Sequence, residues 1–167
     1  MADVKCVERA LETATNKSVV DVAAADDLVF PHVNSCLAIG CLLADGRALG
    51  AHVSMMGVGA DDELDPEMQG MLGATALLPM VAPSSITKVI FLGDQGTWKS
   101  HVGNIRAMLG KKHGIYYDNT NGDGVDLRVS ASGGYLSVCR YTGSKETLVF
   151  KTLAEINSWV AGPVKLT

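Results

Sequence analysis

Two residues that cooperate in acyl-transfer chemistry stand close together in the first third of the chain. Cys36 opens an apolar run over residues 37–43, and His52 is the single polar ring in a second apolar run over residues 48–56. Between the runs, residues 44–47 read Ala-Asp-Gly-Arg, which is typical of a tight turn because glycine adopts positive φ without steric cost. The pattern predicts a β-hairpin with a thiol at its entrance and an imidazole on its second strand.

A thiol becomes a nucleophile when a neighbouring imidazole accepts its proton, so this pair is the minimum equipment for covalent acyl chemistry. The alternative is structural: Cys36 as a buried thiol and His52 as a hydrogen-bonded core histidine. Cys41 with His52 is a second possible pair, but Cys41 lies in the middle of the apolar run and is expected to be structural.

The length of the turn decides whether the pair can meet. A two-residue turn at Asp45-Gly46 would place Ile39 opposite His52, and strand alternation would send Cys36 to the other face. A three-residue loop, or a bulge at Gly40 or Gly50, would put Cys36 and His52 on one face. The chemistry therefore requires one of these irregularities.

Composition limits the classes of function. The 167 residues are expected to form a single domain (1–167), and 14 Lys+Arg against 18 Asp+Glu make a nucleic-acid partner unexpected. The N-terminus has no hydrophobic leader core and no apolar run reaches membrane-spanning length, so no membrane insertion is expected. Without an export signal the four cysteines are expected to be reduced thiols, which favours a cytoplasmic location. They lack zinc-ligand spacing, and neither metal nor cofactor is expected.

The elements around the hairpin alternate between helix and strand patterns. This order predicts an α/β (α+β) fold with a mixed β-sheet or β-sandwich flanked by helices. The expected helices are an N-terminal one carrying Val4, Val7 and Leu11, one that starts at Asp65-Pro66, one over 97–113 with Gly114 as its left-handed cap, and one over 153–160. The expected strands outside the hairpin cover 18–23, 87–92, 115–117, 125–129, 135–140 and 148–150.

A stretch over residues 93–100 has some features of a phosphate-binding loop between a strand and a helix. Trp98 stands where the second glycine of that loop is needed, so an ordinary strand–turn–helix is the better interpretation. His101 and His113 have no third ligand nearby, and the acids of 61–65 and 118–126 are better explained by solvated loops and turns than by a cation site.

The segment Ser35-Cys36 through Gly50-Ala51-His52 resembles the signature of the chemoreceptor glutamine deamidases, the CheD family. In that family a Gly-Ser-Cys opens a strand, and a histidine preceded by glycine follows about sixteen residues later. The catalytic domains of the cytotoxic necrotizing factors share this arrangement. The resemblance covers roughly residues 18–141, so a CheD-like core with an N-terminal helix and a C-terminal strand and helix is expected.

Carried over by position, the resemblance implies Cys36 as nucleophile and His52 as general base, with backbone amides near Ser35 holding the oxyanion. The family threonine six residues before the cysteine is Phe30 here, and the family glycine before Ser35 is Asn34. The arginine that usually follows the glycine-rich turn is replaced by Val125. The third, orienting group is therefore expected to be His32, Asn34 or a backbone carbonyl.

The resemblance implies a protein-glutamine deamidase whose partner is a protein substrate with a reactive glutamine, with chemotaxis as the family's setting. The departures from the pattern indicate that the substrate need not be a chemoreceptor. A non-catalytic interaction module on the same scaffold is the competing interpretation. Secretion as an effector is a third, with which the N-terminus is compatible.

Overall fold

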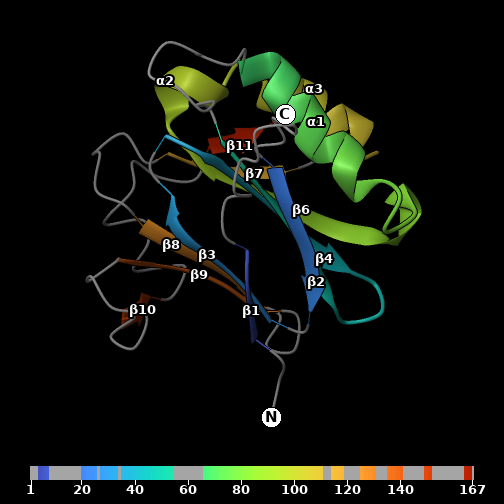
Figure 1. The fold of residues 1–167 in the computed structure, drawn as a ribbon, viewed down its shortest axis with the longest axis vertical. Helices are drawn as coiled ribbons and strands as arrows, with labels where there is room; N and C mark the ends of the chain where they lie inside the picture. Colours follow the sequence, from blue (N-terminus) through green and yellow to red (C-terminus); the bar gives the residue numbers. More distant parts are fainter. Residues whose placement is uncertain are drawn as a thin grey trace, which may run out of the picture.

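The chain folds into two β-sheets and a layer of helices (Figure 1). A computed structural model describes residues 4–7, 20–25, 27–33, 35–54, 66–110, 114–118, 125–130, 135–140, 149–151 and 164–166, giving the backbone course for those after 110. The strands are β1 (Val4–Cys6), β2 (Val20–Ala25), β3 (Asp27–Val33), β4 (Leu37–Leu43), β5 (Ala48–Val53), β6 (Ile86–Gly93), β7 (Gly114–Asp118), β8 (Val125–Ser130), β9 (Tyr135–Arg140), β10 (Val149–Lys151) and β11 (Val164–Leu166). The helices are α1 (Pro66–Leu77), α2 (Gln95–Trp98) and α3 (Val102–Met108), with a 3₁₀ turn η1 (Pro83–Ser85).

The larger sheet has six strands in the order β11-β7-β6-β4-β5-β2, and the smaller has five in the order β1-β3-β8-β9-β10. The pairs β6–β7 and β1–β3 are parallel, whereas β4 pairs antiparallel with both of its neighbours. Helices α1 and α3 cover one face of the six-stranded sheet, and the five-stranded sheet lies on the other face (Figure 1). The predicted mixed-sheet α+β fold is confirmed.

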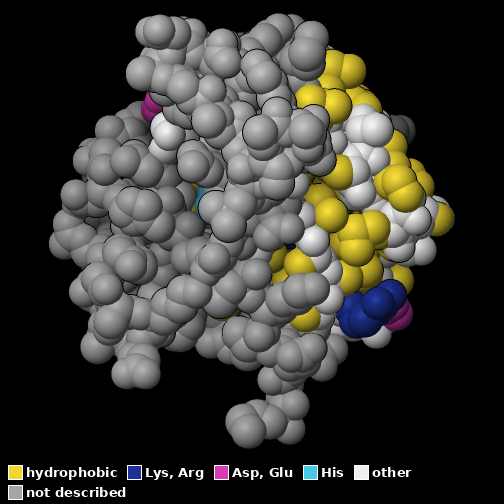
Figure 2. All heavy atoms as spheres, in the orientation of Figure 1, with side chains coloured by type: hydrophobic (Ala, Val, Ile, Leu, Met, Phe, Trp, Pro, Cys, Tyr) yellow, Lys and Arg dark blue, Asp and Glu magenta, His cyan; other side chains and the backbone are white. Residues whose placement is uncertain are grey.

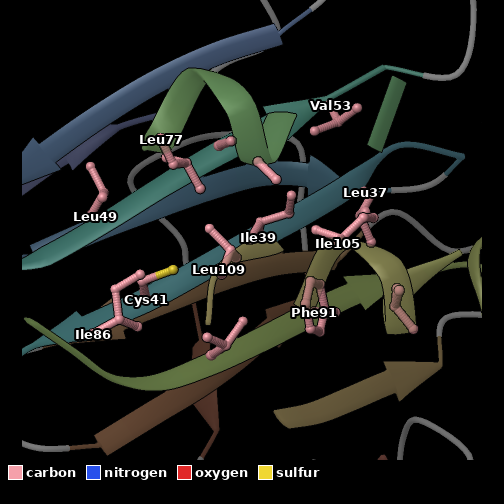
Figure 3. Packing of buried hydrophobic residues seen from close by; sticks show 14 of the residues in the cluster. Leu37, Ile39, Cys41, Leu49, Val53, Leu77, Ile86, Phe91, Ile105 and Leu109 are labelled. Atoms are coloured by element: carbon pink, nitrogen blue, oxygen red, sulfur yellow. The ribbon is translucent and has the colours of Figure 1, made fainter. Parts of the chain in front are cut away.

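Strand β4 lies at the centre of the larger sheet, and all seven of its residues are buried. Leu37, Ile39 and Cys41 project toward the helices, where they pack with side chains of α1, α3 and β6 (Figure 3). Ala38 and Leu42 project the other way, into the layer between the two sheets. A strand that is covered on both faces reads as a continuous apolar run, which explains the absence of alternation in its sequence.

The β4–β5 hairpin has the three-residue loop that the chemistry requires. Leu42 pairs with Ala48, and the Leu43 N–H donates to the Arg47 carbonyl at 2.8 Å, which leaves residues 44–46 as the loop. Gly46 has φ +86°, the left-handed conformation that commonly closes a three-residue hairpin loop. The strands have no bulge at Gly40 or Gly50, because these two residues pair directly in regular register.

Gly50 has a packing role instead. A Cβ at this position would overlap the ring of Phe30 on β3 and would lie 2.8 Å from the Ile39 carbonyl oxygen. The missing side chain therefore lets the aromatic ring of the smaller sheet lie directly against the backbone of the larger one. Phe30 is fully buried in the layer between the sheets.

The N-terminal helix prediction is wrong where the structure describes that segment. Val4–Cys6 form strand β1, which pairs in parallel with β3 from Val4 opposite Asp27 to Cys6 opposite Val29. The apolar spacing was compatible with a helix, but a free edge of β3 provides backbone partners that a local pattern does not reveal. Val7 follows β1 and is not helical either, and the rest of the predicted helix lies outside the described residues.

The predicted helix over 97–113 is also wrong in its bounds. The segment forms two short helices, α2 and α3, separated by a turn at residues 99–101. The left-handed glycine after α3 is Gly110, with φ +69°, and Gly114 instead begins β7. Gly110 is the first glycine after α3 that adopts this conformation, and its N–H bonds to the Ala107 carbonyl at 3.0 Å, so the chain turns earlier than predicted.

The other strand predictions are confirmed to within about two residues, and α1 begins at Pro66 as expected. Strands β3 and β11 were not predicted, and the predicted helix over 153–160 lies outside the described residues. Within the described parts of the chain, no helix combines the length and apolarity needed to cross a bilayer.

Hydrophobic side chains gather on the surface on the side where α1 and α3 lie (Figure 2). Met71, Leu72 and Met80 are each exposed by 40% or more.

Candidate active site

His52 lies near the end of β5 and projects into the layer between the two sheets. It pairs with Ala38 of β4, whose side chain belongs to the core of that layer, and it is only 3% exposed. Among the described residues, the buried polar side chains are His52 and Ser54, two positions apart on the same chain segment. Buried polar groups in an apolar layer call for a specific explanation, and here they occur together at one end of one strand.

The imidazole is held by a backbone group from the smaller sheet. His52 Nδ1 lies 2.9 Å from the carbonyl oxygen of Val7, the residue that follows β1. A carbonyl can only accept, so Nδ1 carries a proton and donates, and when the ring is neutral the buried Nε2 carries the lone pair. The Val7 carbonyl thus selects the tautomer in which Nε2 can act as a base.

The ring is also fixed from its side. The Phe30 ring meets the imidazole edge-on, with centroids 6.5 Å apart and an interplanar angle of 65°. Val7 is anchored in turn, because its own N–H donates to the Val29 carbonyl at 2.7 Å. The orientation of His52 is therefore set by residues of the five-stranded sheet, although His52 belongs to the six-stranded one.

Cys36 lies immediately before β4 and is half-buried. Leu37 pairs with Val53 and projects toward the helices, so strand alternation directs Cys36 toward the face that carries Ala38 and His52. The ladder ends at Leu37 opposite Val53, and its register, if continued by one step, would set Cys36 opposite Ser54 and diagonal to His52. Diagonal cross-strand neighbours are about 7–8 Å apart at Cα, within reach of long side chains.

The backbone before Cys36 is tied to the helix layer. The indole Nε1 of Trp98 donates to the Ser35 carbonyl at 2.9 Å. Gly93, at the end of β6, lies under the same segment: a Cβ there would be 3.2 Å from the Cys36 carbonyl oxygen and 3.1 Å from Trp98 Cδ1. The Ser35–Cys36 backbone is therefore held from the helix side of the sheet, the face opposite His52.

The remaining predicted site residues are distributed as follows. Ser35 is exposed, whereas the side chains of His32 and Asn34 lie outside the described residues. Cys41 is fully buried among the residues that face the helices, on the opposite face of β4 from His52, so the second possible pair is not brought together.

The loop after β6 is not organised around a phosphate. The Asp94 carboxylate accepts the Gly96 N–H at 3.0 Å and the Thr97 hydroxyl at 2.8 Å, and Trp98 is fully buried. A side chain of the protein therefore occupies the position of an anion at this helix start. Elsewhere in the described chain, no group of His, Cys, Asp and Glu side chains is arranged to hold a metal ion.

Two groups that hold the candidate site, the Val7 carbonyl and the Trp98 indole, were not predicted from the sequence. A backbone carbonyl was among the expected orienting groups, but Val7 fell in a segment predicted to be helical. Trp98 was read as an apolar helix residue, since nothing local indicates that its N–H reaches a residue 63 positions earlier. Both contacts join segments distant in sequence, so only their spatial neighbours reveal them.

Neither a family model nor a curated protein matches the chain. Among solved structures, the C-terminal domain of CNFy from Yersinia pseudotuberculosis is similar to this chain with a TM-score of 0.43 and 6% sequence identity. The similarity covers 98% of this chain and 61% of that one, so the chain spans less than two thirds of the length of that structure.

Proposed function

We propose that the protein is a cysteine-dependent amidohydrolase that deamidates a glutamine side chain of a protein substrate, with Cys36 as nucleophile and His52 as general base. The observation that carries the proposal is the hairpin register. It puts Ala38 opposite His52 and so directs Cys36 toward the face on which the imidazole is held by Val7. The glutamine substrate is supported by the resemblance of the Ser35–His52 segment to the CheD family.

Two features of the arrangement support the proposal. Cys36 is half-buried, so its side chain is partly accessible to solvent. The base is oriented by a hydrogen bond at its other ring nitrogen, the role that a third residue plays in related catalytic sites. The Val7 carbonyl takes this role here, so the orienting threonine of the family is not needed and Phe30 stands at its position.

The reaction proceeds in two halves. Cys36 Sγ, having given its proton to His52 Nε2, attacks the side-chain amide carbon of glutamine, and backbone N–H groups at Ser35 and Cys36 bind the resulting oxyanion. The His52 proton passes to the amide nitrogen, the C–N bond breaks, and ammonia leaves a thioester on Cys36. His52 then takes a proton from water, which attacks the thioester to release glutamate and the thiol.

Ammonia release from benzyloxycarbonyl-glutaminyl-glycine and from unfolded casein tests the proposal. Cys36→Ser and His52→Gln should reduce the rate to the level without enzyme while leaving the circular dichroism spectrum unchanged. Cys41→Ala and His101→Gln are matched controls: Cys41 lies on the same strand but on the other face, and His101 is half-buried just before α3. Both controls should retain activity.

Alkylation of the thiols separates catalysis from the non-catalytic alternative. A nucleophilic Cys36 should react with iodoacetamide faster than Cys41, Cys6 and Cys139, and the reaction should persist at pH values where an ordinary thiol is almost entirely protonated. Loss of that advantage in His52→Gln would support the pair. Equally slow labelling of all cysteines, together with ammonia release that does not depend on Cys36, would refute the proposal and favour an interaction module.

A further inference from the structure

We infer that Trp98 is a positioning residue for the reaction: its indole N–H fixes the Ser35–Cys36 peptide so that the Cys36 N–H is aimed as an oxyanion donor. The inference rests on the proposed function and adds a residue for which neither the motif nor the hairpin provides a reason. Three features of the structure carry it: the hydrogen bond from Trp98, the planarity of the peptide and the packing of Gly93.

The direction of the Cys36 N–H follows from the Ser35 carbonyl. The Ser35 carbonyl accepts from Trp98 Nε1 at 2.9 Å, and Trp98 belongs to the core cluster on the helix side of the six-stranded sheet. In a trans peptide the C=O and the following N–H point in opposite directions. The Cys36 N–H therefore points away from the Trp98 indole, which lies on the helix side of the sheet.

The anchor is rigid. Trp98 is fully buried, and its place at the end of α2 is set by Asp94, whose carbonyl accepts the Trp98 N–H at 2.9 Å and whose carboxylate accepts the Thr97 hydroxyl at 2.8 Å. Gly93 allows the Trp98 indole to approach the Ser35 carbonyl, because any side chain at position 93 would be pressed against both the indole and the Cys36 carbonyl oxygen. A donor fixed in advance stabilises developing charge without reorganisation when the substrate reacts.

This geometry predicts which step depends on Trp98. Attack on an amide or ester carbonyl generates an oxyanion and needs the aimed N–H, whereas alkylation by iodoacetamide generates none and needs only the thiolate. Disturbing the indole hydrogen bond should therefore slow acyl transfer and spare alkylation. A residue that merely stabilised the fold would affect both reactions together.

The test replaces the Trp98 side chain with 3-benzothienylalanine in the full-length chain, which keeps the bicyclic shape but has sulfur in place of the N–H. Trp98→Phe provides a second variant. The measurements are kcat and KM for benzyloxycarbonyl-glutaminyl-glycine, the acylation burst with p-nitrophenyl acetate, and the rate of Cys36 alkylation. We expect kcat and the acylation rate to fall about tenfold or more, since loss of an entire oxyanion donor costs 10²–10³ in kcat. KM and the alkylation rate should stay within about twofold of wild type.

The outcomes are distinguishable. Unchanged kcat in the benzothienyl variant would overturn the role of Trp98 and leave the proposed function standing. A parallel fall in acylation and alkylation would overturn it as well, because the indole would then support the thiol rather than the oxyanion. Absence of Cys36-dependent acyl chemistry in the wild-type protein would instead refute the proposed function, and the inference with it.

Discussion

Replacing Gly50 with alanine should destabilise the protein by forcing apart the two sheets where the Phe30 ring lies against the Gly50 backbone. The added methyl group would overlap the Phe30 ring and lie 2.8 Å from the Ile39 carbonyl oxygen, which is held in the β4–β5 ladder. Because one obstacle is backbone and the other is a fully buried ring, neither can move without disturbing the layer between the sheets.

The expected magnitude combines two terms of opposite sign. Overpacking of a core costs about 1–3 kcal/mol, whereas replacing glycine with alanine lowers the entropy of the unfolded chain and contributes about 0.4–1 kcal/mol of stability. The backbone obstacle puts the first term toward the upper end of its range, so we expect a net loss of about 2 kcal/mol. With a urea m-value of about 1–3 kcal/mol per molar, the unfolding midpoint should fall by roughly 1 M.

Gly103→Ala is the matched control, since Gly103 is exposed on α3 and a Cβ there would meet no atom within 4 Å. Helix propensity predicts a gain of about 0.5–1 kcal/mol for this variant. Urea unfolding followed by circular dichroism should therefore give shifts of opposite sign for the two glycines. Equal stability of Gly50→Ala and wild type, with an unchanged m-value, would refute the steric reasoning.

A double-mutant cycle tests whether the Phe30 ring is the main steric obstacle to a side chain at position 50. If the Phe30 ring is the group that the methyl displaces, Phe30→Leu should relieve part of the cost of Gly50→Ala, with a coupling energy of about 1 kcal/mol. Because Phe30 contacts His52 edge-on, Gly50→Ala should also slow alkylation of Cys36, and Gly103→Ala should not.

The hairpin loop and the β4–β6 pair give three further predictions. Hydrogen bonds from the backbone N–H and then the side chain of Arg47 lower the pKa of Asp45 from its ordinary value of 3.8. The ionised carboxylate therefore contributes a small stabilisation at neutral pH, which is lost as the pH falls below 3.8. Asp45→Asn should lack this contribution in acid unfolding curves. Gly46→Ala should cost about 1–2 kcal/mol in urea unfolding because φ is +86°, with Gly46→Asn costing less. Thr87→Val should cost about 1 kcal/mol in the same measurement by removing the 3.0 Å hydrogen bond to the Leu42 carbonyl, and Thr87→Ser should retain most of it.

Local signals were sufficient where an element is specified by its own residues. The bounds of β4 and β9 were predicted to the residue, and Pro66 marks the start of α1, because apolar runs and helix-start residues act over a few positions. Val4–Cys6 were assigned wrongly because a short edge strand has no independent pattern. Its formation depends on pairing with β3, which is more than twenty positions away in sequence.

The candidate site shows the same division. The types and approximate spacing of Cys36 and His52 are legible in the sequence, and so is a hairpin that joins them. Which face each residue takes is not legible, since the turn allows either a two- or a three-residue loop, and both faces of β4 are apolar, so either register would bury the strand equally well.

The amino-acid sequence by itself determined the hairpin, the identity of the two candidate side chains, Cys36 and His52, and the mixed-sheet class of the fold. Only the tertiary structure decided the register, the tautomer of His52 and the grip on the Cys36 backbone. The register could not be chosen locally because both faces of β4 are apolar, and the other two features depend on partners brought in from elsewhere: the Val7 carbonyl after β1, and the Trp98 indole at the end of α2.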